Sequence, residues 1–263
     1  MAQAIFAATA ARIEEWKSNP DVLGVLHVGS KSRGHGDERS DDDLEVILTE
    51  AAFGRLEPAE TSDVKIEGEG ATRRIVWDAL LMPLSDLARK ADSVHDLDHW
   101  PYESAPVLFA RDRRVGDAVA AAGVMRSDFR AARLRNAAID TWTSLYRAVR
   151  TRERGHDAAA RLLAMRAARA LTRVLFALEG RWVPLDHWLE QELRTLADPT
   201  GAGPRLCAGL ANSDPAPIRE AFEGLSSRLE VEGVPTDRAA RNALFLSLIH
   251  PRNLAERSTH RLD

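Results

Sequence analysis

Short apolar runs separated by polar turns fill the first half of the chain, and this pattern predicts a small α/β unit. Residues 3–17 carry apolar side chains at helical spacing and predict a helix that ends at Asn19-Pro20. A second helix is expected near residues 114–122. Strands are predicted for the apolar runs at 22–28, 43–49, 73–82 and 105–110.

From residue 127 onward the apolar spacing becomes helical throughout. Ser127 is a plausible N-cap, residues 128–153 and 157–178 predict two long helices, and Gly155 separates them. Shorter helices are expected near 184–197, 215–230 and 236–249. The chain therefore predicts an α/β plus all-α architecture, with a small mixed-sheet domain over residues 1–124 and a helical bundle over residues 125–263.

Length, charge and cysteine use narrow the class of protein. A chain of 263 residues can form two modest domains, and its single cysteine, Cys207, allows no intramolecular disulfide. The start lacks the basic segment of a signal peptide, and no apolar run approaches the ~18 residues of a membrane span. We therefore expect a cytoplasmic protein without a membrane partner. The net charge of −4 makes nucleic acid an unlikely partner.

The first predicted strand runs directly into a loop that combines glycine, hydroxyl and positive charge. Gly29 and Gly34 let the backbone approach a ligand closely, because neither carries a Cβ atom. The N–H groups of such a turn form a concave anion-binding surface, and Ser30 adds a hydroxyl donor. Lys31 and Arg33 bring two positive charges to the same loop. The segment therefore predicts a phosphate-binding loop.

Two carboxylates separated by one residue follow this loop, where the second strand begins. Side chains alternate between the faces of a strand, so Asp41 and Asp43 point the same way, as does Glu45. Neighbouring carboxylates repel one another unless a cation lies between them, and Mg²⁺ prefers such hard oxygen ligands. The alternation leaves an Asp43/Glu45 pair open as an alternative. Asp42, between Asp41 and Asp43, is a further acid that could raise the pKa of its neighbours or face the opposite side of the strand.

The loop and the acids resemble the signature of polymerase-beta-type nucleotidyltransferases on Gly29-Ser30, Arg33-Gly34 and Ser40-Asp41-Asp42-Asp43-Leu44. The chain is most similar to small bacterial members, which include antibiotic nucleotidyltransferases and carry a helical C-terminal domain. The resemblance implies that the Gly-Ser turn holds a triphosphate and that Asp41 and Asp43 bind magnesium. The family usually has an apolar residue where this chain has Asp42.

The resemblance also implies a third carboxylate on a later strand, which completes the metal site and accepts the proton of the acceptor hydroxyl. Asp78 is the only acid in the apolar stretch of residues 74–81. A charge inside an apolar strand is costly unless it has a partner, and a metal site provides one. We predict Asp78 as this residue, with Asp86 and Glu67 as alternatives.

Arginines at helical spacing in the second half predict one more phosphate contact. Arg147, Arg150 and Arg154 fall at i, i+3 and i+7 and so share a helix face. Most such charges form a solvated surface. If the bundle leans over the active-site end of the sheet, this face could hold the β- and γ-phosphates, and Arg147 is our candidate.

These patterns predict a Mg²⁺-dependent nucleotidyltransferase that uses two magnesium ions, held by Asp41, Asp43 and Asp78. It would move AMP from ATP, or the monophosphate of another nucleoside triphosphate, onto a hydroxyl of a small-molecule acceptor and release pyrophosphate. Four alternatives stay open: a protein-modifying transferase of a toxin–antitoxin module, a non-catalytic nucleotide-binding protein, a template-free RNA-end polymerase and an interaction protein.

Overall fold

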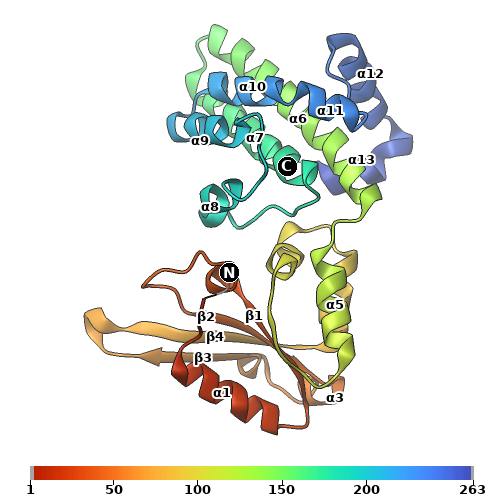
Figure 1. Ribbon diagram of the computed structural model, residues 1–263. Helices are drawn as coiled ribbons and strands as arrows, with labels where there is room; N and C mark the ends of the chain where they lie inside the picture. The colour runs from red at the N-terminus through yellow and green to blue at the C-terminus, as the bar shows by residue number, and fades with distance from the viewer. Residues whose placement is uncertain (1–2, 262–263) are drawn as a thin grey trace. The chain divides into compact units, whose positions relative to one another are not determined.

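The computed structural model describes residues 3–261 and divides into two compact units, Met1–Val124 and Met125–Asp263 (Figure 1). The first unit holds a mixed β-sheet with helices. The second contains only helices and turns among the residues described. The predicted fold class, an α/β region followed by an all-α region, is confirmed.

The sheet has five strands within residues 3–261, in the order β3-β4-β2-β1-β5. The strands are β1 (Val22–Val28), β2 (Asp42–Leu48), β3 (Ser62–Glu67), β4 (Arg74–Pro83) and β5 (Val107–Ala110). β2 and β4 run parallel, whereas the other neighbouring strands are antiparallel. The parallel pairing places Asp43, at the start of β2, directly opposite Asp78 of β4.

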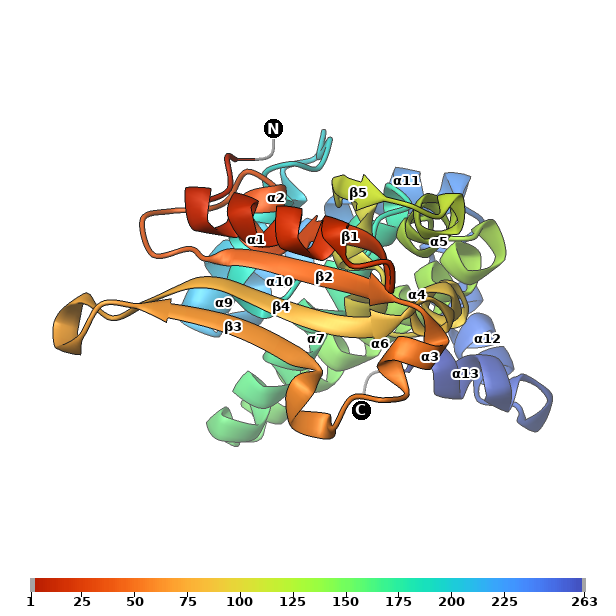
Figure 2. The ribbon, with the colours of Figure 1, turned by 90° about the horizontal axis from the view of Figure 1, so that it is seen from below.

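Helices cover both faces of this sheet. α1 (Ala7–Ser18) lies along one face (Figure 2). α4 (Leu84–Arg89) and α5 (Arg113–Gly123) cover the other. Because successive side chains of a strand point to opposite faces, Leu44 joins the core under α1 and Ile47 joins the core under α4 and α5.

Short helical turns link the larger elements of the first unit and position its loops. They are α2 (Gly29–Ser32), α3 (Glu50–Phe53), η1 (Pro58–Glu60), η2 (Gly70–Thr72), η3 (Lys90–Asp92), η4 (Asp96–Asp98) and η5 (Trp100–Glu103). α2 follows β1 directly, so the loop predicted to bind phosphate starts as a single helical turn.

Two long helices, α6 (Ser127–Glu153) and α7 (Asp157–Leu178), form the centre of the second unit. Ala160, Ala164 and Ala167 of α7 are fully buried, and such small side chains let helices pack closely. The other elements are η6 (Asp186–Trp188), α8 (Leu189–Leu193), α9 (Ala202–Asn212), α10 (Pro215–Gly224), α11 (Ser226–Val231), α12 (Arg238–Leu248), η7 (Pro251–Asn253) and α13 (Leu254–His260).

The long, strongly periodic segments match their predictions. The strand predicted at 22–28 and the helices predicted at 128–153 and 157–178 are confirmed, with ends that differ by at most one residue. The other predicted strands are confirmed within two residues at each end. Strong apolar periodicity therefore located the main elements of both units.

Several short elements were predicted wrongly or missed. The helix expected near 184–197 is wrong in extent, because only η6 and α8 form there. The helix expected near 215–230 is interrupted at Leu225, between α10 and α11. Strand β3 and helices α4, α9 and α13 were not predicted. β3 alternates charged residues with Val64 and Ile66, which stay 44% exposed, so it lacks the apolar run of an interior strand.

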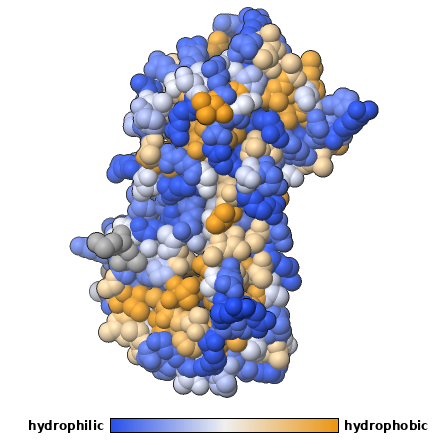
Figure 3. Space-filling model, turned by 45° about the vertical axis from the view of Figure 1, so that its right-hand side comes forward, coloured by the Kyte–Doolittle hydropathy of each residue, from blue (hydrophilic) through white to orange (hydrophobic). Residues whose placement is uncertain are grey.

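Hydrophobic side chains also reach the surface of both units, where they lie in patches among hydrophilic residues (Figure 3). Exposed apolar side chains are normal on folded proteins. Within residues 3–261, no helix has the length and apolar character needed to cross a bilayer.

Candidate active site

The loop after β1 begins with a residue that must be glycine. Gly29 has a φ of 72°, in the left-handed region that other residues rarely adopt. A Cβ atom at this position would lie 1.8 Å from Oδ2 of Asp43, so the carboxylate occupies the space that a side chain would need. The backbone N–H of Ser30 donates a hydrogen bond to the same carboxylate. The turn therefore fixes the position of Asp43.

The three predicted catalytic carboxylates lie within electrostatic reach of one another. Asp43 and Asp78 are register neighbours on β2 and β4, and Asp41 immediately precedes β2. Burial, followed by repulsion from Asp41 and Asp78, raises the pKa of Asp43 to about 7. Burial and then the charge of Asp41 also raise the pKa of Asp78. The structure thus brings together acids that lie 37 positions apart in the chain.

This cluster has no internal counter-charge within residues 3–261. No lysine or arginine in the described part of the chain forms an ion pair with Asp41, Asp43 or Asp78. Within residues 3–261, no group of three or more carboxylate, imidazole or thiol side chains is placed so that it could hold a metal ion by itself. Mg²⁺ commonly binds to one or two carboxylates and completes its shell with waters and substrate phosphates. The donor set therefore suits a metal ion that arrives with a phosphorylated substrate.

Asp42 lies on the opposite face of β2 and is neutralised there. Its side chain is fully buried, 2.9 Å from Nζ of Lys31, and it accepts a hydrogen bond from the backbone N–H of Phe6. The Lys31 ammonium also lies 3.4 Å from the centre of the Phe6 ring. The structure thus places Lys31, a predicted phosphate contact, in a buried ion pair on the face covered by α1.

Arg33, the other predicted basic contact of the loop, is held by η5. Its Nη2 lies 3.1 Å from a carboxylate oxygen of Glu103, and its Nη1 donates to the carbonyl of Trp100 at 2.9 Å. The guanidinium also lies over the Trp100 ring, 4.7 Å from the ring centre. Arg33 therefore fastens the loop to a segment about 70 residues further along the chain.

Glu45 shares the face of Asp43 and has its own partners. The Tyr102 hydroxyl donates to the Glu45 carboxylate at 2.6 Å, and Nζ of Lys90 lies 3.7 Å away. Burial raises the pKa of Glu45. Burial also raises the pKa of Tyr102, with the charge of Glu45 as the next cause. The Asp43/Glu45 alternative is therefore less favoured by the geometry than the grouping with Asp78.

The other predicted site residues are exposed or have partners of their own. Arg147 is exposed on α6 in the helical unit. Asp86 pairs with Arg89 in α4, and Glu67 lies 3.5 Å from Arg74 at the end of β3. Asp78 is thus the only one of the three candidate third acids that is in register with Asp43.

Sequence reasoning missed the residues that hold the loop and Glu45 in place. Phe6, Glu103, Tyr102 and Lys90 all lie outside the segment that carries the motif. One signal was available in the sequence, because a buried charge needs a partner. It applied to Asp42 and Lys31, which both lie next to a predicted strand. The identity of distant partners depends on tertiary packing.

Comparison with known proteins finds likenesses among solved structures. No protein-family profile matches the sequence, and no curated protein sequence matches it. A crystal structure of a nucleotidyltransferase-like protein from Exiguobacterium sibiricum 255-15 is 16% identical and covers 96% of this chain and 84% of its own. The TM-score of 0.46 is low, so the function proposed below depends on the chain's own residues.

Proposed function

We propose that the chain is a Mg²⁺-dependent nucleotidyltransferase that moves AMP from ATP onto a hydroxyl of a small-molecule acceptor and releases pyrophosphate. The proposal is carried by the convergence of Asp41, Asp43 and Asp78 beside the Gly29 turn. Their mutual repulsion favours protonation when no cation is near, and a divalent cation would relieve it. An anion-binding turn beside a carboxylate cluster suits a metal-bound triphosphate.

Each residue has a role that follows from its position. Asp41, Asp43 and Asp78 would hold two magnesium ions, which when bound neutralise phosphate charge and clamp the attacking and leaving oxygens. Asp78 is the most exposed of the three and has a raised pKa, so it suits acceptance of the hydroxyl proton. Gly29 and Ser30 would border the leaving pyrophosphate, and Arg147 stays a predicted phosphate contact.

The bond changes balance without a further reactant. The acceptor oxygen bonds to the α-phosphorus, and the bond from that phosphorus to the bridging oxygen of pyrophosphate breaks. The hydroxyl proton passes to the Asp78 carboxylate. Positioning and charge neutralisation supply most of the rate gain in such transfers.

The proposal is tested with α-labelled ATP, Mg²⁺ and a panel of hydroxyl-bearing small molecules that includes aminoglycosides, by following labelled product and pyrophosphate. Wild type should give both, whereas Asp43→Asn and Asp78→Asn should form both at rates lower by orders of magnitude. Glu67→Gln and Asp86→Asn are matched controls that remove an acid outside the cluster and should keep wild-type rates. Equal activity of Asp43→Asn and wild type would refute the proposal.

The same samples separate two other functions. An intact-mass increase of one nucleotide on an added protein would identify a protein acceptor in place of a small molecule. Mg²⁺-dependent stabilisation by ATP without any product, across the whole panel, would identify a nucleotide-binding protein without transfer activity.

A further inference from the structure

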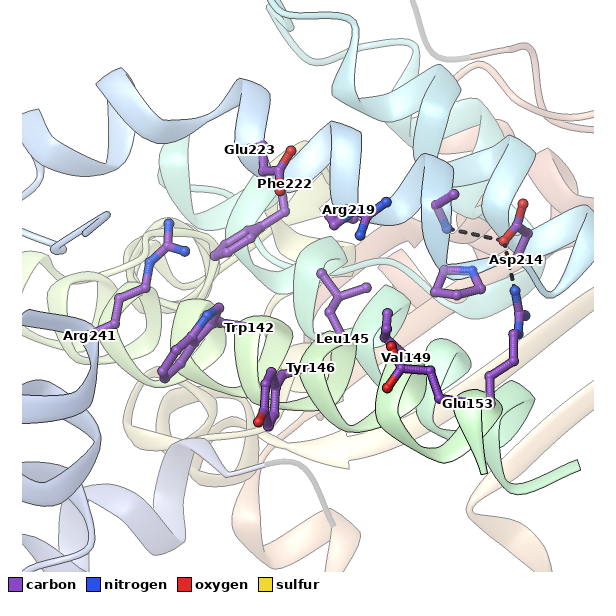
Figure 4. A pocket seen from close by; sticks show the side chains of 13 residues that line it. Trp142, Leu145, Tyr146, Val149, Glu153, Asp214, Arg219, Phe222, Glu223 and Arg241 are labelled. Carbon is purple, nitrogen blue, oxygen red and sulfur yellow. Dashed lines mark hydrogen bonds and ion pairs between the residues drawn. The ribbon is translucent and has the colours of Figure 1, made fainter. Parts of the chain in front are cut away.

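A pocket of about 540 Å³ opens within the helical unit, among α6, α10 and α12 (Figure 4). Its size falls in the range of small-molecule sites, which are mostly apolar with a few polar groups. Its apolar wall consists of Trp142, Leu145, Tyr146, Val149 and Phe222. All the lining residues belong to one unit, so the pocket is independent of the carboxylate cluster.

Aromatic rings dominate this pocket. Trp142 and Tyr146 are four residues apart on α6 and therefore share one helix face. Phe222 projects from α10 on the other side of the pocket (Figure 4). Tyr146 is 56% exposed, which leaves much of a large ring available for contact. Phe222 is 2% exposed, so most of the accessible ring surface belongs to Trp142 and Tyr146. Two such rings on one helix face favour a flat ligand that can stack or pack edge-on.

Two acids of the pocket already have basic partners. Asp214 lies 3.6 Å from Arg152, which also lines the pocket. Glu153 lies 3.5 Å from Arg150. Among the charged groups lining the pocket, this leaves two guanidinium groups, Arg219 and Arg241, against a single carboxylate, Glu223. The lining as a whole is neutral, with three arginines and three acids, whereas its groups without an ion pair carry one excess positive charge.

Of these two cations, Arg241 gives the stronger indication of an anionic ligand. Within residues 3–261 it forms no ion pair, and its guanidinium lies 5.1 Å from the centre of the Phe222 ring. Burial lowers the pKa of Arg241 despite the nearby carboxylates of Glu223 and Asp237. Arg241 is partly buried, and its Nε donates a hydrogen bond to the carbonyl of Pro235 at 3.3 Å. Its planar guanidinium matches the geometry of a carboxylate.

We propose that this pocket binds a small aromatic carboxylate, whose ring lies among Trp142, Tyr146 and Phe222 and whose anionic group pairs with Arg241. Arg219 supplies a second cation at the rim. Binding at this site requires neither nucleotide nor metal, so its test is independent of the proposed transferase activity, on which the proposal does not rest.

Calorimetric titration with four probes tests both halves of the site. Indole-3-acetate carries ring and anion, indole-3-acetamide the ring alone, tryptamine the ring with a cation, and acetate the anion alone. Indole-3-acetate should bind wild type about tenfold more tightly than the amide, since a charge-assisted pair is worth about 1.4 kcal/mol more than a neutral one. Tryptamine and acetate should bind more weakly still.

Variants assign the binding to this pocket. Arg241→Gln should weaken indole-3-acetate about tenfold and leave the amide unchanged. Arg238→Gln makes the same charge change on α12 outside the pocket lining and should bind like wild type. Tyr146→Ala removes an exposed ring, so it should fold normally and weaken both indoles alike.

Three outcomes would overturn the proposal. The first is equal affinity for the acetate and the amide. The second is an equal loss of affinity in Arg238→Gln and Arg241→Gln, which would indicate a general charge effect. The third is the absence of any indole-3-acetate binding up to its solubility limit.

Discussion

At the start of β2, carboxylates on the two faces of the sheet have opposite electrostatic surroundings. On the α1 face, Asp42 is fully buried, paired with Lys31 and hydrogen-bonded to the backbone of Phe6. On the other face, Asp43 is surrounded by acids, and its pKa rises to about 7. The two residues are adjacent in sequence and chemically identical, so only their surroundings distinguish them.

The difference separates a structural charge from a functional one. A buried charge that the fold itself needs has its partner within the fold, as Asp42 does. A carboxylate whose nearest charges are other carboxylates is stable only if protons or an external cation neutralise it. The contrast supports the proposal that Asp43 belongs to a ligand site, whereas Asp42 has its partner within the fold.

The largest expected effect comes from the Asp43 face. Asp43→Asn should lower kcat for nucleotidyl transfer by about 10³-fold or more, because a metal-binding oxygen is lost. It should not lower the melting temperature of the metal-free protein, since it removes repulsion among acids. Steady-state kinetics and thermal unfolding of one preparation measure both. A large fall in stability would instead make Asp43 a structural residue like Asp42.

On the Asp42 face, Lys31→Met should destabilise the protein by about 3–5 kcal/mol, because it leaves a buried carboxylate without its partner. Denaturant unfolding measures this loss. The double variant Lys31→Met/Asp42→Asn removes both charges and should recover more than half of it. If Lys31→Met unfolds like wild type and binds ATP more weakly, Lys31 is a phosphate contact after all.

A smaller effect is expected where the turn meets Asp43. Gly29→Ala should cost about 2–3 kcal/mol, since it combines an unfavourable φ with a clash against the carboxylate. Gly155 has a φ of 78° and no atom within 4 Å of an added Cβ, so Gly155→Ala carries the backbone cost alone. The difference in unfolding free energy between the two variants isolates the contact with Asp43. Equal losses would contradict that contact.

The smallest predicted effect is a pH dependence of stability in metal-free protein. The pKa of Asp43 is raised from 3.8 to about 7 on folding, so its contribution is full below pH 4 and is lost as the pH rises through 7. After allowance for solvent exposure, the loss is about 1–2 kcal/mol. The difference between wild type and Asp43→Asn in urea unfolding at several pH values reports it. If the stability of wild type relative to Asp43→Asn rose with increasing pH, the raised pKa of Asp43 would be contradicted.

The sequence predicted those parts of the site that depend on neighbours in the chain. The Gly29-Ser30 turn and the spacing of Asp41 and Asp43 are local features, whereas the sequence left open whether Asp42 joins them or faces the other side of the strand. The pairing of Asp43 with Asp78 needed the parallel register of β2 and β4, which no local pattern specifies. The sequence supplied Asp78 as a candidate only because it is an acid within an apolar strand.

The sequence could not identify the distant residues that hold the loop after β1. Arg33 and Glu103 lie 70 residues apart, and a solvated loop charge has the same local pattern as one that anchors the loop. The edge strand β3 was missed for a similar reason, because its charged, half-exposed alternation resembles that of a loop. In both cases tertiary packing, which the sequence pattern does not reveal, decides the structure.

Binding of Mn²⁺, a stand-in for Mg²⁺ that is counted by its paramagnetic signal, compares the two faces most directly. Wild type and Lys31→Met/Asp42→Asn should bind Mn²⁺ in the presence of ATP with similar affinity, after subtraction of Mn²⁺ bound to ATP alone. Asp43→Asn should bind it at least about tenfold more weakly, because a ligand is lost. If Asp43→Asn binds Mn²⁺ as tightly as wild type, the acids beside the Gly29 turn do not form a metal site.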